Sequence, residues 1–387
     1  MRNKSGRDAG RRRPRLLHLL VGPALALSAP VWAKEAAAAV PMVLYTDITS
    51  GPSSGGENDK GIYLSIFGQH FGSSLQGVKV RIGGAEVDNY RYLGASRGRP
   101  DVQQLTVQLG GLGNPPALTP LPIVVSVNGA DSNADHTFTV VPGNIYFVAP
   151  DGVDTKDTSS GGSFLRPFRT VQRPDGMRTS FSIESAYTTG AYGRVRAGDF
   201  IVLRSGTYRG VGFGGQGGTG YFMQTLNKSG CPVGVRCPQG GAKSSGPITL
   251  MGYPGETAFI DRTNTLGDDR FGGGISSADS ARQQLGYGAW WNIVDLKIES
   301  GFNDGPVNTQ RGESNPLGGH WRVVNNELTG DSCQISTKCR AGAIAGSGLG
   351  EYWVGNYGHD IYDKPDGLTD LENHGIYIGG PGSYEIA

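Results

Sequence analysis

A repeat with a step of thirty residues is the feature that most constrains how this chain can fold. Its copies are Ile293-Val-Asp-Leu-Lys-Ile298, Val323-Val-Asn-Asn-Glu-Leu328 and Trp353-Val-Gly-Asn-Tyr-Gly358. A unit this short cannot bury its apolar face alone, so successive units must stack on one another. Stacked strands lie about 4.8 Å apart. The repeat therefore predicts a coil of parallel strands in which Val294, Val324 and Val354 lie one above another, while equivalent side chains line a groove outside.

Two asparagines, Asn326 and Asn356, hold equivalent positions in this repeat. Asparagine side chains bond readily to nearby backbone groups, which is useful where a chain turns. We therefore expect this pair to stabilise a corner of the coil.

The composition favours an all-β chain without a nucleic-acid partner. The 387 residues include 64 Gly and 22 Pro, which favours turns over helices. At about 150 residues per domain, the length indicates two or three domains. The 35 Lys and Arg residues nearly balance the 34 Asp and Glu residues, and many of the basic ones gather at the N-terminus. We therefore do not expect nucleic acid as a partner.

Residues 1–33 have the pattern of a signal peptide. A basic head, Arg2–Arg15, precedes an apolar run, Leu16–Pro30, and Val31-Trp32-Ala33 fits a small-residue cleavage site. We expect a secreted or periplasmic protein with no membrane span after cleavage. The pair Arg11-Arg12 leaves the twin-arginine and general secretory routes both open. A membrane anchor is the weaker alternative, because the apolar run is interrupted and falls short of about 18 residues.

The four cysteines form two pairs with five residues between the partners, Cys231 with Cys237 and Cys333 with Cys339. In an exported chain this spacing favours two local disulfides. Zinc binding is the weaker alternative, because the spacing is not that of a usual zinc site and no histidine pair lies nearby in the sequence.

Residues 41–142 alternate apolar and polar positions between Gly and Pro turns, which predicts a β-sandwich. The expected strands are Ile62–Phe67, Val78–Ile82, Leu105–Leu109, Ile123–Val127 and Thr137–Val141.

This segment resembles the TIG family of immunoglobulin-like domains. The resemblance rests on Gly68-Gln-His-Phe71-Gly72 after a strand, on Val80-Arg-Ile-Gly83-Gly84 and on the final strand from Thr137. It implies a module without catalytic residues. A spacer is the expected role, and sugar binding is the alternative.

Residues 144–387 resemble the pectin-lyase-like superfamily. Three motifs stand in order: the strand and turn Ile145–Gly152, then Arg166-Pro-Phe-Arg-Thr-Val-Gln172, then Ala197-Gly-Asp leading to Gly206-Thr-Tyr208. The resemblance implies a right-handed parallel β-helix and an acidic polysaccharide substrate. An insert, 173–196, separates the last two motifs, and we expect a short helix near Ser182–Tyr187. Because no capping segment follows Ile376–Gly379, we expect further coils beyond Ala387.

Titratable residues are densest between His359 and His374, where a groove on a coil would suit an extended polymer. Elimination from a uronate needs a base beside the abstracted proton and a cation to neutralise the carboxylate. The candidate bases are Lys364, His359 and His374. Calcium is the candidate cofactor, with Asp363, Asp366, Asp370 and Glu372 as its ligands. A solvated acidic turn is the alternative interpretation of the same carboxylates.

We expect a monomeric polysaccharide lyase, with Arg311, His320 and Trp353 as candidate substrate-binding residues. Core packing is the alternative for the tryptophans beside the repeat strands. A glycoside hydrolase would need a pair of carboxylates such as Asp366 and Asp370, and it ranks below the lyase. A non-catalytic carbohydrate-binding or adhesin-like protein is the alternative outside the enzymes.

Overall fold

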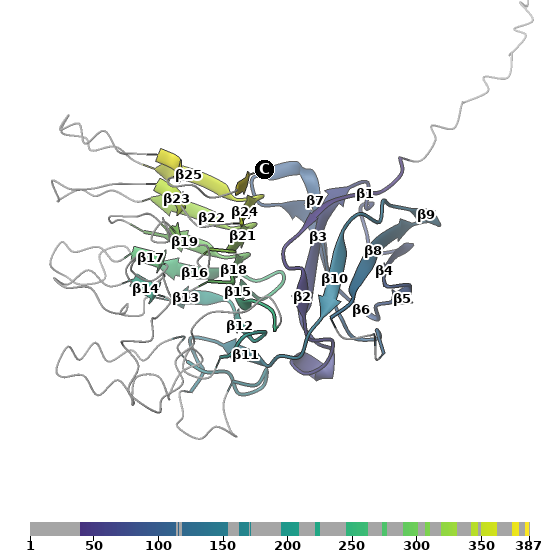
Figure 1. Cartoon of the computed structure of the whole chain (residues 1–387), viewed down its shortest axis with the longest axis horizontal. Helices are drawn as coiled ribbons and strands as arrows, with labels where there is room; N and C mark the ends of the chain where they lie inside the picture. Colours follow the sequence, from purple (N-terminus) through teal and green to yellow (C-terminus); the bar gives the residue numbers. More distant parts are fainter. Residues whose placement is uncertain are drawn as a thin grey trace, which may run out of the picture. The chain divides into compact units, whose positions relative to one another are not determined.

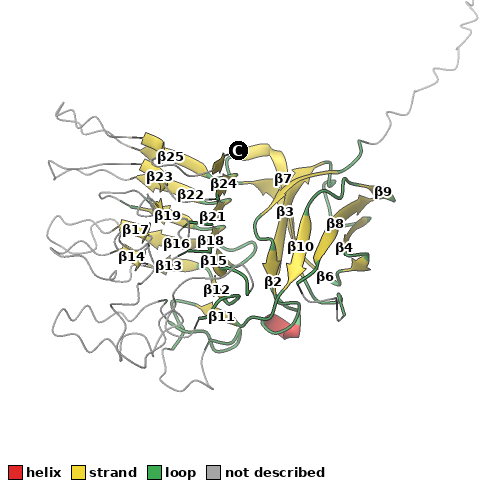
Figure 2. Cartoon of the chain, in the orientation of Figure 1, coloured by secondary structure: helices red, strands yellow, loops and turns green. Residues whose placement is uncertain are grey.

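The computed structural model describes residues 39–113, 115, 118–153, 162–169, 171, 195–208, 221–224, 245–261, 273–276, 289–300, 306–309, 319–330, 342–346, 350–361, 374–378 and 384–386. Across these residues the regular structure is β-strand, apart from one 3-10 turn, η1 (Glu57–Asp59) (Figure 2). None of the described residues forms a helix long and apolar enough to cross a membrane. The expected all-β class is therefore confirmed.

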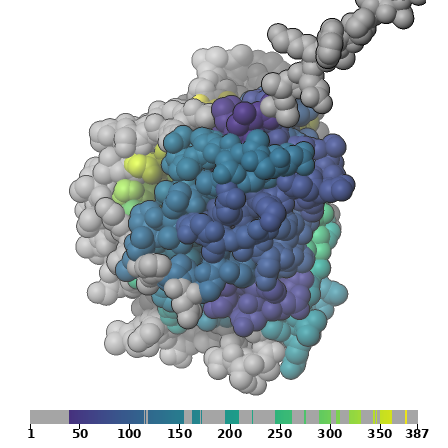
Figure 3. Space-filling model, turned by 90° about the vertical axis from the view of Figure 1, so that its right-hand side faces the viewer, coloured from purple at the N-terminus to yellow at the C-terminus, as the bar shows by residue number. Residues whose placement is uncertain are grey.

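The N-terminal module, residues 42–140, contains two sheets. The first is antiparallel, in the order β1 (Met42–Thr46), β3 (Tyr63–Gln69), β7 (Arg99–Gln108) and β6 (Asn89–Ser96). The second has the order β2 (Ser50–Gly51), β10 (Thr137–Val140), β8 (Pro120–Val127), β4 (Val78–Ile82) and β5 (Ala85–Glu86), with β9 (Ala130–Asp131) beside β8. Figure 3 looks onto this module. Burial alternates along β4, as the apolar–polar pattern predicts: Val78, Val80 and Ile82 are buried.

The parallel-sheet module, residues 145–386, contains three sheets. The first parallel sheet has the order β11 (Ile145–Val148), β12 (Phe200–Leu203), β15 (Ile248–Gly252), β18 (Trp291–Val294), β21 (Arg322–Val324), β24 (Glu351–Val354) and β27 (Tyr384–Ile386). The second has β13 (Gly206–Tyr208), β16 (Ala258–Asp261), β19 (Lys297–Glu299), β22 (Glu327–Gly330) and β25 (Tyr357–Ile361). The third has β14 (Tyr221–Gln224), β17 (Gly273–Ser276), β20 (Val307–Thr309), β23 (Gly342–Gly346) and β26 (His374–Ile378). From β12 onward the chain visits the three sheets in rotation, so each round adds one strand to each sheet (Figure 1).

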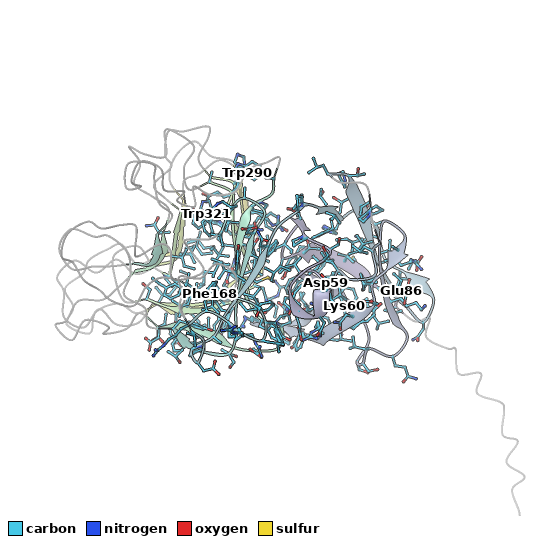
Figure 4. All side chains as sticks on the ribbon, turned by 90° about the horizontal axis from the view of Figure 1, so that it is seen from below. Asp59, Lys60, Glu86, Phe168, Trp290 and Trp321 are labelled. Carbon is cyan, nitrogen blue, oxygen red and sulfur yellow. The ribbon has the colours of Figure 1, made fainter. Side chains whose placement is uncertain are left out.

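The register of the first parallel sheet confirms the thirty-residue repeat. Val294 pairs with Val324, and Val324 pairs with Val354. The neighbouring column, which includes Ile293 and Val323, points the other way and belongs to the core between the three sheets. Trp321 and Phe168, labelled in Figure 4, belong to the same core. Both faces of this sheet carry buried apolar columns because both are covered.

The outer column of the first parallel sheet packs against the N-terminal module. Val324 and Val354 share a cluster with Tyr45 and Phe67, and the rings of Tyr45 and Phe67 stack with centroids 4.6 Å apart. The Arg322 guanidinium donates to the carbonyl of Thr46 at 2.8 Å. Residues 39–387 accordingly form a single compact unit.

The two asparagines form a ladder at the corner between the first and second parallel sheets, as expected. Asn326 Oδ1 accepts from the backbone N–H of Leu296 at 3.0 Å, while its Nδ2 donates to the carbonyl of Ile293 at 2.9 Å and to Asn356 Oδ1 at 3.0 Å. Asn356 repeats the pattern one coil later by donating to the carbonyl of Val323 at 2.7 Å. The ladder thus satisfies backbone groups that the turn leaves unpaired.

Three expectations lie outside the described residues. These are the signal peptide, residues 1–33, the helix near Ser182–Tyr187 and the two cysteine pairs, Cys231 with Cys237 and Cys333 with Cys339.

Replacing Asn326 by Ala should destabilise the protein by roughly 2–4 kcal/mol, because it leaves a buried N–H and a buried carbonyl without their partner. Urea unfolding of Asn326→Ala measures this change. Thr207→Ala, at an exposed position on β13, is the matched control and should shift stability by less than about 0.5 kcal/mol. Equal stabilities for the two variants would contradict the structural role of the ladder.

Asp47 makes the stability of the fold depend on pH. Burial raises the pKa of its carboxyl to about 7, although Oδ1 accepts from the backbone N–H groups of Ile48 and Ser65. Its Oδ2 has no hydrogen-bond partner among the described residues. An aspartate in the unfolded chain has a pKa of about 3.9. Between about pH 4 and 7, the folded chain therefore keeps a proton on Asp47 that the unfolded chain releases. The stability contributed by the neutral carboxyl is present below pH 4 and is lost as the pH rises to 7.

The free energy of unfolding of the wild type should therefore fall by on the order of 3 kcal/mol between pH 5 and pH 8 because of Asp47. Asp47→Asn, which is never ionised, should remove most of that loss, as measured by urea unfolding at both pH values. Asp151→Asn, at an exposed turn, is the control and should keep the wild-type pH dependence. The assignment fails if Asp47→Asn and the wild type lose the same stability over this range.

Candidate functional site

The outer face of the second parallel sheet carries two columns of polar and aromatic side chains. In the first column, Phe259 pairs with Lys297, Lys297 with Glu327 and Glu327 with Tyr357. The second column contains Asp261, Glu299, Thr329 and His359. We call the set Lys297, Glu327, Tyr357, His359 and Asp360 the outer-face site.

Strand alternation explains why the side chains of the two columns face outward, whereas Asp360 lies at a bulge of β25. The column between them, which includes Ile260, Ile298 and Leu328, is fully buried in the core. Successive side chains of a strand point to opposite faces, so the residues on either side of the buried column must point away from the core. The thirty-residue step then brings Lys297, Glu327 and Tyr357 into line.

Glu327 lies at the centre of the outer-face site. Its Oε1 accepts from Lys297 Nζ at 2.6 Å and lies 3.5 Å from His359 Nε2. Its Oε2 accepts from Arg97 Nη1 at 3.4 Å. Burial favours a higher pKa, but the hydrogen bond and charge of Lys297 and the charge of Arg97 outweigh it, so the pKa of Glu327 lies below its ordinary value.

His359 lies between two carboxylates. Its Nδ1 is 2.8 Å from Asp360 Oδ2, and its Nε2 is the nitrogen that faces Glu327. The ring stacks on Tyr357 with centroids 4.3 Å apart. Nδ1 is thus held by Asp360, whereas Nε2 is buried and makes no hydrogen bond to any described residue. Tyr357 is 42% exposed, so the stacked pair offers an accessible aromatic surface.

A buried polar layer supports this site from the turn between the first and second parallel sheets. Asn325 Nδ2 donates to Asp295 Oδ1 at 3.1 Å, and Arg97 Nε donates to the same oxygen at 3.1 Å. Burial raises the pKa of the Asp295 carboxyl, while the charge of Arg97 and the hydrogen bonds oppose this rise. Arg97 thus contacts both the supporting layer and Glu327.

Of the three candidate bases, the structure describes the side chain of His359 alone. His374 begins β26, where its backbone pairs with Gly342, and its side chain is not described. Several further candidates lie outside the described residues: Lys364, Asp363, Asp366, Asp370, Glu372 and Arg311.

The tryptophans beside the repeat strands divide into two groups. Trp291, Trp321 and Trp353 are at most 2% exposed and belong to the core. They therefore follow the alternative of core packing. This includes Trp353, the candidate substrate-binding residue, whose ring no sugar can reach from solvent. Trp290 is half-buried and stacks on the candidate His320 with centroids 4.1 Å apart (Figure 4). Trp290 and His320 lie on successive turns into the first parallel sheet, away from the outer columns of the second.

Sequence reasoning missed four residues around His359. Lys297, Glu327 and Tyr357 stand thirty residues apart inside segments that align, so the repeat itself carried the signal for them. Arg97 had no such signal, because it lies in another module and reaches Glu327 only through the fold.

Comparison with protein-family models gives no match, and comparison with curated proteins gives none either. Among the described residues, no three His, Cys, Asp or Glu side chains come together in a group fit to hold a metal ion.

Removing the ammonium of Lys297 should raise the pKa of Glu327, because less positive charge then remains to offset the effect of burial. Carbon NMR titration of the Glu327 carboxyl in Lys297→Met measures the direction of the change. Lys79→Met removes an ammonium from a surface pair with Glu86 and is the control. An unchanged Glu327 titration in Lys297→Met would contradict the charge balance described above.

Proposed function

We propose that this chain is an exported protein that cleaves an acidic, uronate-containing polysaccharide by β-elimination at the outer-face site. The fold within this proposal is a TIG-like immunoglobulin sandwich followed by a right-handed parallel β-helix of the pectin-lyase-like type. The rotation of the chain through three parallel sheets and the asparagine ladder support it. The signal-peptide pattern supports export, and the two proposed disulfides suit the same oxidising compartment.

One observation carries the proposal: an exposed aromatic ring, an imidazole and an ammonium occur together on one face of successive strands. Tyr357 offers a surface on which a sugar ring can stack. Lys297 donates one N–H to Glu327, and its side chain is 32% exposed. An ammonium has three N–H donors, so others can bind a substrate carboxylate. The columns run across the strands, so several sugar units of an extended chain fit along them.

The chemistry assigns a role to each group. A base removes the proton next to the uronate carboxylate, the bond to the departing sugar oxygen breaks, and a carbon–carbon double bond forms. Lys297 neutralises the carboxylate as negative charge develops. His359 supplies a proton to the departing oxygen from Nδ1, the nitrogen that also contacts Asp360, because Nε2 is buried. The base remains a proposal from the sequence, either Lys364 or His374.

Calcium remains part of the proposal through Asp363, Asp366, Asp370 and Glu372, which stand outside the described residues. If bound there, it would neutralise the substrate carboxylate. No step assigned to Lys297 or His359 depends on it. The proposed partner is the polysaccharide alone, with the protein acting as a monomer.

A carbohydrate-binding protein without catalysis is the second candidate function. The specific observation in its favour is that Lys297 and Arg97 are both held in ion pairs with Glu327 and that His359 contacts Asp360, an arrangement that also serves a binding surface. The hydrolase alternative ranks lower, because its carboxylate pair, Asp366 and Asp370, gains no support from the described residues.

Incubation of the mature chain with alginate, pectate and glycosaminoglycans should yield unsaturated product from at least one polymer, detected by its ultraviolet absorbance. His359→Ala should lower the rate roughly 10²–10⁴-fold, because the departing oxygen loses its proton donor. His136→Ala, in the N-terminal module, is the matched control and should cleave at the wild-type rate.

The outcomes separate the candidate functions. Retention of a polymer on a column without cleavage would favour the binding protein, and saturated product would favour the hydrolase. Cleavage that is unaffected by His359→Ala would remove His359 from the chemistry. Loss of cleavage on adding a chelator, restored by calcium, would support the proposed cofactor.

A further inference from the structure

The hairpin between β6 and β7 is anchored on the turn that precedes the outer-face site. Ser96 Oγ lies 3.0 Å from Asn325 Oδ1, and the backbone N–H of Arg97 donates to the same oxygen at 3.4 Å. Asn325 Nδ2 in turn donates to Gln104 Oε1 at 3.2 Å. The Asn325 amide therefore bonds to both strands of the hairpin, which fixes the tip of the hairpin relative to the second parallel sheet.

The guanidinium of Arg97, at the tip of the hairpin, donates hydrogen bonds to two carboxylates. Nε donates to Asp295 at 3.1 Å and Nη1 donates to Glu327 Oε2 at 3.4 Å. Its side chain is 20% exposed, as is that of Glu327. Because Arg97 takes Oε2, the other oxygen of Glu327 is left to Lys297 and His359. The orientation of Glu327 is thus set from the N-terminal module.

Gly98 brings the same hairpin against the aromatic part of the site. A Cβ at this position would lie 2.5 Å from Tyr357 Cδ2, closer than any side chain tolerates, so the hairpin backbone packs directly on the Tyr357 ring. His359 stacks on the same ring. Gly98 also has a φ of 61°, a conformation that suits glycine.

We infer that Arg97 is a positioning residue of the outer-face site, and that the N-terminal module completes this site instead of serving as a spacer. Through Glu327 and Tyr357, the hairpin holds His359 and Lys297 where a polymer meets them. The catalytic part of this inference rests on the proposed function, whereas the positioning of His359 is measurable without any substrate.

Three variants of the full mature chain test the inference. Arg97→Met removes the charge and the hydrogen bonds but keeps the length of the side chain. Gly98→Ala pushes on Tyr357 and leaves Arg97 in place. Arg99→Ala is the matched control on the same hairpin, because Arg99 forms its ion pair with Asp101, which is not part of the site. Circular dichroism and thermal unfolding establish that each variant folds.

The substrate-free readout is the NMR signal of the His359 imidazole, assigned by its loss in His359→Ala. Arg97→Met and Gly98→Ala should each move this signal, and Arg99→Ala should leave it at the wild-type position. With the polymer that the wild type cleaves, Arg97→Met and Gly98→Ala should lower kcat on the order of ten- to hundredfold, as misplacement of a reacting group does. Arg97→Lys, which restores the charge without the forked geometry, should recover part of kcat.

The two readouts separate this inference from the proposed function. If the wild type cleaves no polymer, a moved His359 signal still supports positioning by the hairpin, and an unmoved signal overturns it. If the wild type cleaves a polymer, the inference is overturned when both folded variants keep the wild-type kcat and the wild-type His359 signal. Should Arg97→Met fail to fold, Gly98→Ala decides between these outcomes.

Discussion

Hydrogen bonding between parallel strands in a fixed register is the interaction on which the rest of this structure depends. The period of a strand is two residues, so a slip of one residue would exchange the inner and outer columns of every later coil. Val294 would then leave the N-terminal module, and Ile293 would leave the core. Correct register is therefore enforced from both faces of the first parallel sheet, because apolar side chains are covered on each.

The corner between the first and second parallel sheets links this architecture to the candidate site. Asp295, Asn325 and Gly355 occupy equivalent positions there, and all three have a left-handed φ, from 53° to 66°. Asn326 and Asn356, which form the ladder, directly follow the turn residues Asn325 and Gly355. The same turn presents Asp295 and Asn325 to the hairpin of the N-terminal module. A structural device of the coil thus also fixes the polar layer below the outer-face site.

The charges in this region form one connected network rather than separate pairs. Arg97 bridges Asp295 and Glu327, and Lys297 and His359 share the remaining oxygen of Glu327. Removing one member of a partly buried network leaves its partner charged and unpaired, which costs more than losing a surface ion pair. The exposed residues of the site, Tyr357 and Asp360, thus lie beside a network of partly buried charges.

The sequence by itself determined the all-β class, the register of the coils and the asparagine ladder, because a fixed step of thirty residues forces equivalent side chains into columns. It also singled out His359, since titratable residues cluster there. It did not identify Arg97, which contacts Glu327 across 230 residues of sequence separation. Tertiary structure alone decided that contact, the burial of Trp353 and the pairing of His359 with Glu327. Each depends on which face of a strand meets another part of the chain, and no local pattern encodes that.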